Sequence, residues 1–287
     1  MSKKLPYLNL GCGSHYNEDW VNVDFVSTGA GVIGHNLKNG IPFNDNSFEV
    51  VYHSHVLEHF TKHDGKKFLT ECYRVLKPGG IIRVAIPDLQ KIIEQYQNIL
   101  SQLKQKPNDQ YLKACYDWIL LEMYDQTVRN KSGGSMAEYL QQPGLLNEDY
   151  ILDRCGYEVK FIIDSYRNAE NKNLQAISVH SPGIIKRMVT FFSAFRSLHS
   201  IKTMLAKKLL GKEYKFYELG KFKSGGEIHQ WMYDEYSLSR LLSEIGFKNI
   251  RLCQPFESNI KEWNNFSLET VGGKIRKPDS LFMEASK

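Results

Sequence analysis

The chain has 287 residues, 42% of them hydrophobic, so it can bury one large core. Its net charge of +5 is mild, and residues 184–223 alone hold ten lysines and arginines against two glutamates, so a general nucleic-acid-binding surface is not implied. No apolar run reaches the roughly 18 residues that span a bilayer, and the five cysteines form no C-x-x-C pair, which indicates a soluble protein of the reducing cytoplasm.

Residues 7–89 alternate strand-like and helix-like patterns, which is typical of a parallel sheet covered by helices. We expect strands at residues 7–10, 20–24, 31–34, 49–53 and 81–86. Between the last two, apolar residues recur at helical spacing from Phe68 to Leu76, and this helix is expected to stop at Pro78-Gly79-Gly80. The segment therefore predicts a strand, helix, turn, strand unit.

A helical insertion is expected in the middle of the chain. From Leu89 to about Ser224, helical periodicity dominates and no convincing strand pattern is present. A helix that ends at Gly246 then follows, with strands at 249–253 and 280–285. We predict a core made of residues 1–89 and 226–287, with residues 90–225 as an inserted cap that binds an acceptor.

A glycine pair follows the first strand, in "LNLGCGSHYNEDWVNVDF", residues 8–25. Such a turn lets backbone N–H groups approach a ligand, and Asp24 at the tip of the second strand can accept hydrogen bonds from a ribose diol. A dinucleotide site would have a third glycine where Tyr16 stands and an acid further along, so a pyrophosphate is disfavoured. A plain structural turn is the alternative for the glycines alone.

The next segments, in order, are "VNVDF", "HNLKNGIPFNDNSFEVVYHSHVLEHF", "ECYRVLKPGG" and "IIRVAIPDL". With "LNLGCG" they resemble the class I S-adenosylmethionine-dependent methyltransferases, in particular the group typified by the type 11 methyltransferase domain. The resemblance covers residues 7–89 and, less specifically, 226–285. It implies a Rossmann-like α/β fold whose sheet is mostly parallel with an antiparallel last strand, and S-adenosyl-L-methionine as cofactor.

The resemblance also implies a cofactor site. Residues 11–13 would line the methionine and ribose, Asp24 would hold the ribose hydroxyls, and Asn36 would meet the adenine amino group through its side-chain oxygen. Residues 53–55 would border the sulfonium. The predicted cofactor-binding residues are Asn9, Gly11, Cys12, Gly13, Asp24, Phe25, Asn36, Leu37, His53 and Ser54.

The chain departs from the family pattern in three ways. Asn9 and Asn36 stand where acids are common, which keeps hydrogen-bonding ability but removes negative charge that would favour a sulfonium. The loop from Gly13 to Trp20 is also too short for a full first helix. A non-catalytic methyltransferase-like binding or scaffold protein is therefore the alternative to an enzyme.

The motif "HVLEH", from His55 to His59, also fits the H-x-x-E-H pattern of some zinc peptidases. Zinc would need both histidines on one helical face and a third ligand from elsewhere. Because the motif directly follows a predicted strand in a segment that the methyltransferase resemblance already explains, we predict no metal.

Methyl transfer to a hydroxyl requires a positioned acceptor and removal of a proton, for which histidine is well suited. The candidate bases are His53, His55 and His229, each with a structural role as the alternative. The predicted substrate-binding residues are Asp125, Gln126, Arg129 and Trp231. The stretch around the first three is followed by a glycine pair, which is typical of a pocket element or lid hinge, or of an exposed helix end.

The expected function is methylation of a small-molecule or glycan acceptor, most simply at an oxygen of a sugar precursor. Stretches like that around Asp125 resemble a bacterial subgroup of these methyltransferases associated with surface polysaccharide synthesis. Residues 184–223 are basic and amphipathic, which suggests peripheral contact with a membrane or a protein. If the contact is with a membrane, the chain would be an enzyme acting on a lipid-linked glycan. The alternative is a face that packs on the core, with solvated lysines on its other side.

Overall fold

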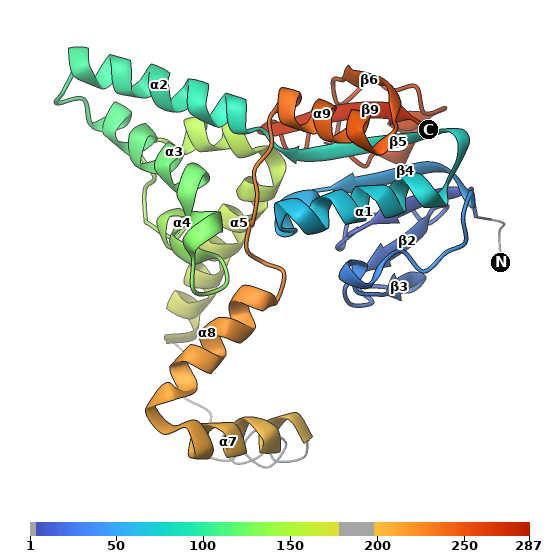
Figure 1. The fold of residues 1–287 in the computed structure, drawn as a ribbon. Coiled ribbons are helices and arrows are strands. Elements are labelled where there is room, and N and C mark those ends of the chain that lie inside the picture. The colour runs from blue at the N-terminus through green and yellow to red at the C-terminus, as the bar shows by residue number, and fades with distance from the viewer. Residues whose placement is uncertain (1–3, 178–197) are drawn as a thin grey trace.

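The computed structural model describes residues 4–177 and 198–287, with a seven-stranded sheet at the centre (Figure 1). The strand order is β3-β2-β1-β4-β5-β9-β6; β9 runs antiparallel to both its neighbours, and the other pairs are parallel. The strands are β1 (Tyr7–Leu10), β2 (Val21–Asp24), β3 (Val32–Gly34), β4 (Phe48–Ser54), β5 (Leu76–Pro87), β6 (Lys248–Leu252) and β9 (Ser280–Ser286). The predicted fold class is confirmed.

The strand boundaries differ most around β5. The helix before it, α1 (Lys62–Val75), ends earlier than expected, and Pro78-Gly79-Gly80 lie inside the long strand that starts at Leu76. A register irregularity between Phe48 and Val50 accommodates the glycines beside β4. A small hairpin of β7 (Thr270–Val271) and β8 (Lys274–Ile275) was not expected, because two-residue strands leave no periodic signal.

One face of the sheet is covered by α1 and α9 (Glu235–Ile245) (Figure 1). Alternate strand residues such as Leu8, Leu10 and Val51 pack with the apolar stripe of α1 in one core. The ends of α9 follow from its sequence: Asp234 and Ser237 form a capping box, and Gly246 ends the helix in the left-handed conformation. The two helices thereby fix the sheet whose strand ends form the site.

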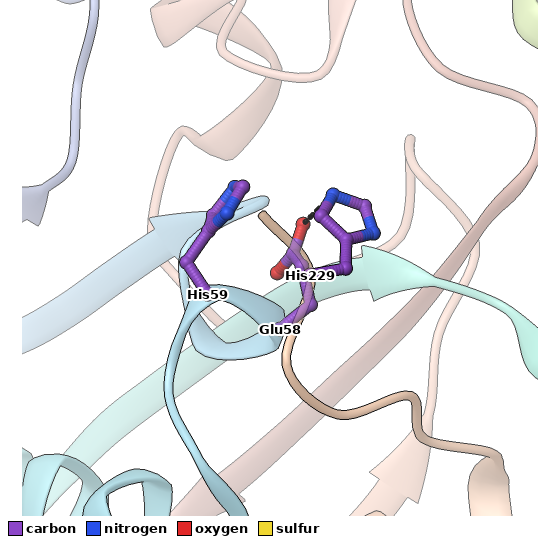
Figure 2. Close-up of side chains that lie close together, drawn as sticks. All are labelled: Glu58, His59 and His229. Carbon is purple, nitrogen blue, oxygen red and sulfur yellow. Dashed lines mark ion pairs between the residues drawn. The ribbon is translucent and has the colours of Figure 1, made fainter. Parts of the chain in front are cut away.

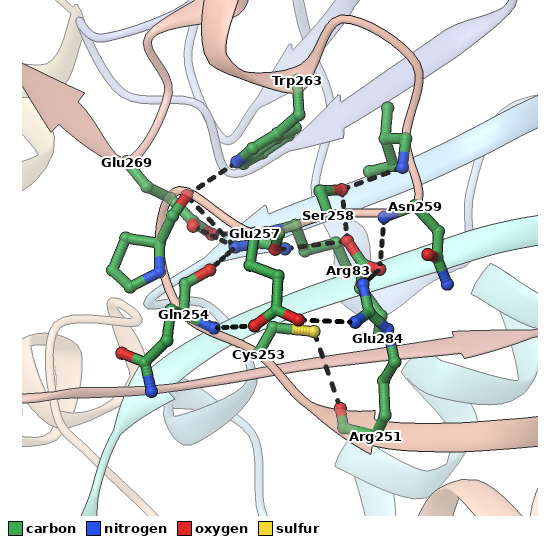
Figure 3. A network of polar contacts seen from close by, with 12 residues as sticks. Arg83, Arg251, Cys253, Gln254, Glu257, Ser258, Asn259, Trp263, Glu269 and Glu284 are labelled. Carbon is green, nitrogen blue, oxygen red and sulfur yellow. Dashed lines mark hydrogen bonds and ion pairs between the residues drawn. The ribbon is translucent and has the colours of Figure 1, made fainter.

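The other face is covered by the chain between β6 and β9, which includes the short 3-10 helix η4 (Trp263–Phe266). Trp20, Tyr52 and Trp263 meet there edge to face. Buried Arg83 of β5 anchors this covering segment through Glu269 and three backbone carbonyls (Figure 3). Between β1 and β2 the chain makes only turns, as the short glycine loop predicted.

Between Leu89 and Ser224 the described residues form helices and turns without a strand. The helices are α2 (Leu89–Gln105), α3 (Gln110–Val128), α4 (Gly134–Leu140), α5 (Glu148–Ile177), α7 (Leu198–Leu210) and α8 (Tyr214–Ser224). They have apolar clusters of their own, centred on Trp118 and Ile119, so the insertion packs a second core. Figure 1 shows α8 and α7 projecting away from it. Among the described helices, none is both long and apolar enough to cross a membrane.

The insertion is joined to the sheet domain along α5. Gly156 interrupts this helix with φ of 70°, and a Cβ there would lie 2.5 Å from Pro278. The N–H of Tyr157 donates to the carbonyl of Arg276, and Lys277 pairs with Glu158 at 3.1 Å. The first part of the predicted basic segment, residues 184–197, lies outside the described residues.

Candidate functional site

Gly11, the first glycine of the turn after β1, has a backbone conformation and surroundings that only glycine tolerates. Gly11 has φ of 64°, and a Cβ there would meet Val56 at 2.2 Å. Its N–H donates to the carbonyl of Val23 on the neighbouring strand at 2.8 Å. Two residues later, the N–H of Gly13 donates to Asp24 Oδ2 at 2.7 Å. The turn and the acid are thus locked together.

A pocket of about 260 Å³ opens where the parallel strands end, beside this turn. Its lining combines the tips of several strands with the segment after α8, and consists of Gly11, Asp24, Phe25, His35, Asn36, Leu37, Lys38, His55, Val56, His59, Phe60, Ser224, Gly225 and Gly226. Five of the predicted cofactor residues meet here: Gly11, Asp24, Phe25, Asn36 and Leu37. The site therefore has the position that ligands take in open parallel sheets.

The other predicted cofactor residues do not line this pocket. Asn9 is buried and donates to the side chain of Asn22 at 3.1 Å. Cys12 is buried in the turn, and burial raises the pKa of its thiol to about 11. Gly13 acts through Asp24, as described above, and Ser54 ends β4.

His53 lies in the core instead of beside the pocket. Its ring is fully buried against Phe68 of α1, at 5.1 Å between ring centroids, and neither ring nitrogen has a hydrogen-bond partner. Burial lowers the pKa of His53 to about 3, so the ring is neutral. His53 therefore has the structural role that was the alternative for each candidate histidine. In this conformation its buried ring cannot act as a base.

Asn36, which was predicted to face the adenine, also stabilises the local backbone. Asn36 caps the 3-10 helix η1 (Leu37–Asn39), its side chain accepting from the N–H of Lys38 at 3.0 Å. An amide oxygen has two lone pairs, so the cap leaves one acceptor position. Of the residues that line the pocket, Asp24 is the only carboxylate, which places the pocket's negative charge at the predicted ribose position.

Four polar side chains form a cluster beside the pocket. His55 and His59 line the pocket, and Figure 2 draws His59 with the other two members, Glu58 and His229. Glu58 Oε1 lies 3.3 Å from His55 Nδ1 and 4.0 Å from His229 Nε2, while the rings of His59 and His229 meet edge to face at 4.8 Å. Burial raises the pKa of Glu58 to about 8. Burial also lowers the pKa of all three histidines, so these rings are neutral at physiological pH.

Backbone hydrogen bonds hold this cluster together from distant parts of the chain. The N–H groups of Gln230 and Trp231 both donate to the carbonyl of Glu58, at 2.7 and 3.3 Å. The N–H of His229 donates to the carbonyl of Gln126 at the end of α3. The chain that leaves the insertion is therefore bonded both to the insertion's own α3 and to the turn after β4.

The predicted substrate residues are placed differently from one another. Asp125 is buried and accepts from the N–H groups of Ser135 and Met136, so it caps α4. Arg129 pairs with Glu227 at 3.5 Å, next to the histidine cluster. The carbonyl of Gln126 accepts a hydrogen bond from the N–H of His229. Trp231 lies on the surface, and Lys62 Nζ is 5.0 Å from the centroid of the Trp231 ring. The structure therefore gives Asp125 a structural partner.

Sequence reasoning missed Glu58 as a site residue. It considered the two histidines of "HVLEH" as zinc ligands, which would need both on one helical face, and predicted no metal. The structure has a 3-10 turn here, η2 (Leu57–His59), with Glu58 directed toward His229 (Figure 2). The signal available in the sequence was an acid between two histidines after a strand. His229, which lies next to Glu58 in the structure, is 171 residues further along the chain, and no local sequence pattern connects the two residues.

Comparison with protein families matches residues 14–84 to the methyltransferase domain. This confirms the predicted family for that part of the chain, and it supports S-adenosylmethionine as the cofactor. None of the curated protein sequences matches the chain. The matched segment begins just after the glycine turn and ends within β5. It contains Asp24 and the "HVLEH" turn, but not Gly11, Gly13, the insertion or His229.

Solved structures of methyltransferases are similar to this chain only distantly. A structure of a S-adenosylmethionine-dependent methyltransferase from Archaeoglobus fulgidus is 12% identical, covers 100% of this chain and 87% of its own, and has a TM-score of 0.36. A putative methyltransferase complex with its activator from Haloferax volcanii is 18% identical over 32% of this chain and 50% of that chain, with a TM-score of 0.26.

A phosphoethanolamine N-methyltransferase from Haemonchus contortus, in complex with phosphomonomethylethanolamine and S-adenosylhomocysteine, is 15% identical. It covers 62% of this chain and 46% of that chain, with a TM-score of 0.26. The chain thus matches about half the length of the Haloferax volcanii structure. Likenesses this distant carry nothing about the acceptor.

Proposed function

We propose that this chain is a S-adenosylmethionine-dependent methyltransferase that methylates a small-molecule acceptor, at an oxygen of a sugar or glycan precursor. The observation that carries the proposal is the pocket where the glycine turn, Asp24 and Leu37 meet at the ends of the parallel strands. It is formed largely within the segment that matches the methyltransferase domain. The polysaccharide context rests on the sequence resemblance alone.

The residues present fit the cofactor. Asp24 is fixed by Gly13 and faces the pocket, where its carboxylate can accept both hydroxyls of a ribose. The remaining acceptor position of Asn36 suits an adenine amino group, and Leu37 and Phe25 offer apolar contact to the ring. When bound, the cofactor supplies a methyl group activated by a positive sulfonium.

The acceptor is proposed to enter from the side of the insertion. Ser224, Gly225 and Gly226 lead directly from α8 into the pocket wall, so the insertion closes the side that the sheet leaves open. His55, which lines the pocket, and His229, whose ring contacts that of His59, are both neutral and are proposed as alternative acceptors of a proton from an acceptor hydroxyl. Residues 90–225 are accordingly proposed as the acceptor-binding cap, and residues 1–89 and 226–287 as the cofactor-binding core.

Titration calorimetry with S-adenosylmethionine and S-adenosylhomocysteine tests the cofactor half of the proposal. We expect both to bind to the full chain, and Asp24→Ala to weaken binding by about 10- to 100-fold, because a charged acceptor of two hydrogen bonds is lost. Asp19→Ala is the matched control, since this acid is exposed just before β2. Absence of binding at millimolar concentration would refute the proposal and favour the scaffold alternative.

The acceptor half needs an activity screen. Sugars, nucleotide sugars and glycans would be incubated with the chain and a cofactor radiolabelled in its methyl group. Transfer that is lost in Asp24→Ala and kept in Asp19→Ala supports the proposal. Acceptance of amines but of no hydroxyl compound would contradict methylation at oxygen.

A second candidate role concerns α7 and α8. These helices project from the insertion with exposed Met204, Leu209 and Phe216 next to lysines such as Lys207 and Lys215, a combination suited to anionic lipid surfaces. An enzyme acting on a lipid-linked glycan would use such an arm. Co-sedimentation with phosphatidylglycerol vesicles, lost in Lys207→Glu with Lys208→Glu, supports this role, and no co-sedimentation contradicts it.

A further inference from the structure

The polar cluster beside the pocket contains a buried carboxylate without a partner. Glu58 is 1% exposed, and among the residues that the structure describes neither of its carboxylate oxygens has a hydrogen-bond partner. Most buried polar side-chain atoms in native proteins have a hydrogen-bond partner, so a buried carboxyl group without one calls for an explanation, such as a bound ion. Histidines approach Glu58 from two sides, but neither approach has hydrogen-bond geometry.

The cations whose charges act on this cluster, Lys277 on Glu58 and Arg129 on His59 and His229, already have carboxylate partners. Arg129 pairs with Glu227 at 3.5 Å, and Lys277 pairs with Glu158 at 3.1 Å. The described residues therefore give Glu58 no protein cation of its own. Its carboxylate oxygens are therefore available to a group that the described residues do not supply.

Three candidate ligand atoms converge on one point. One atom each from Glu58, His59 and His229 lie within 4.8 Å of one another, and Figure 2 shows the two rings on either side of the carboxylate. Ligands of a tetrahedral zinc ion lie about 3.3 Å apart when each bond is about 2.0 Å. Small rotations about the side-chain torsions would close the remaining difference.

The hydrogen bonding of His59 prepares its ring for metal binding. His59 Nδ1 lies 3.3 Å from the carbonyl oxygen of Ile228, and because a carbonyl only accepts, this nitrogen carries the proton. The lone pair is then on Nε2. Metal-binding histidines usually donate their other N–H in this way, which fixes the tautomer and the ring orientation.

We propose that Glu58, His59 and His229 form a binding site for a divalent first-row transition metal, such as zinc or manganese. Two imidazoles and one carboxylate suit these ions better than magnesium or calcium, which prefer oxygen ligands. Three protein ligands leave coordination positions open, as in catalytic sites. Because His59 also lines the pocket, an open position would face the pocket, where it can hold an acceptor hydroxyl. This last role rests on the proposed function, whereas metal binding does not.

Metal binding is tested on the full chain without a histidine tag, stripped with a chelator and measured without the cofactor. Titration calorimetry with zinc chloride and manganese chloride is expected to show one site. Glu58→Gln and His229→Asn should each weaken binding by at least about 100-fold, since losing even an outer partner costs about 10- to 100-fold. His63→Asn is the control, because this histidine is exposed at the start of α1 and should leave affinity unchanged.

Cobalt absorption gives an independent readout. Cobalt bound by imidazoles in a protein site gives visible bands that report its coordination, and these should vanish in Glu58→Gln while circular dichroism shows the variant folded. No binding by the wild-type chain at millimolar metal would overturn the proposal. Equal affinity in Glu58→Gln and the wild type would also overturn it, because the ion would then lie elsewhere. Loss of S-adenosylmethionine binding with metal binding retained would refute only the proposed function.

Discussion

The chain buries two clusters of charged and polar side chains on β4, β5 and the segments beside them, and they differ in how completely they are satisfied. Arg83 is fully buried and bonds Glu269 through Nε and Nη2, at 3.0 and 2.5 Å, Glu284 at 2.7 Å, and the carbonyl of Glu257 at 2.8 Å (Figure 3). Glu58 is equally buried, yet its carboxylate has no hydrogen bond (Figure 2).

The difference distinguishes a polar cluster that stabilises the fold from one that can bind a ligand. The Arg83 cluster, meaning Arg83 with Glu269 and Glu284, lies under the segment between β6 and β9 and fastens it to the sheet. A closed network of this kind makes one backbone arrangement strongly preferred. The Glu58 cluster, meaning Glu58 with His55, His59 and His229, lies at a pocket and leaves its bonding capacity open. Unsatisfied buried groups are expected at sites that bind something.

The largest effect is expected for Arg83→Met, which leaves Glu269 buried without its cation and leaves Glu284 with Arg251 alone. Removing one partner of a buried pair costs about 3–5 kcal/mol of the free energy of unfolding. Denaturant unfolding followed by circular dichroism measures the loss. Arg240→Met is the control, since Arg240 is exposed on α9 and pairs with Glu244, a contact worth about 0–1 kcal/mol. A loss below 1 kcal/mol for Arg83→Met would show that the network is not structural.

A smaller effect is expected for Glu269→Gln. The amide keeps one acceptor toward Arg83 but gives up the charge and one of the two hydrogen bonds, which costs about 1–3 kcal/mol. The same unfolding measurement applies. Stability equal to that of the wild type would mean that the second carboxylate, Glu284, is sufficient to pair Arg83.

The smallest effect is expected for Glu58→Gln in the metal-free chain. No hydrogen bond of the carboxylate is lost, so the free energy of unfolding should stay within about 1 kcal/mol of the wild type. The variant is therefore expected to lose metal affinity without losing stability, the reverse of Glu269→Gln. A destabilisation as large as that of Arg83→Met would erase the distinction between the two clusters.

Much of the sheet domain could be predicted from the sequence because its signals are local. Alternating strands, the apolar stripe of α1 and the stop at Gly246 each depend on a few neighbouring residues. The end of α1 was misplaced because Pro78-Gly79-Gly80 resembles a helix stop although β5 runs through it. The cover over the second sheet face was missed, since residues 253–279 have no periodic pattern.

The site was predictable where it follows the family pattern, and less so where it depends on distant contacts. Gly11, Asp24 and Leu37 line one pocket at the strand ends, and their binding of the cofactor stays a prediction. Asp125 was assigned to substrate binding, but a carboxylate before a glycine turn has the same local signature when it caps a helix. Glu58 and His229 are brought together by backbone bonds that residues 229–231 make after the insertion, a long-range contact that no local pattern predicts.

The position of β9 has a consequence for the order in which the chain can fold. This strand comes last in the sequence but lies between β5 and β6, and β6 pairs with no other strand of the sheet. During synthesis β5 therefore presents an unpaired edge, and unpaired edges invite association with other chains. Ser280 of β9 also meets His55 Nε2 at 2.8 Å. Closure of the sheet and completion of the pocket wall are thus one late event, and a nascent chain that stalls before residue 280 would have neither.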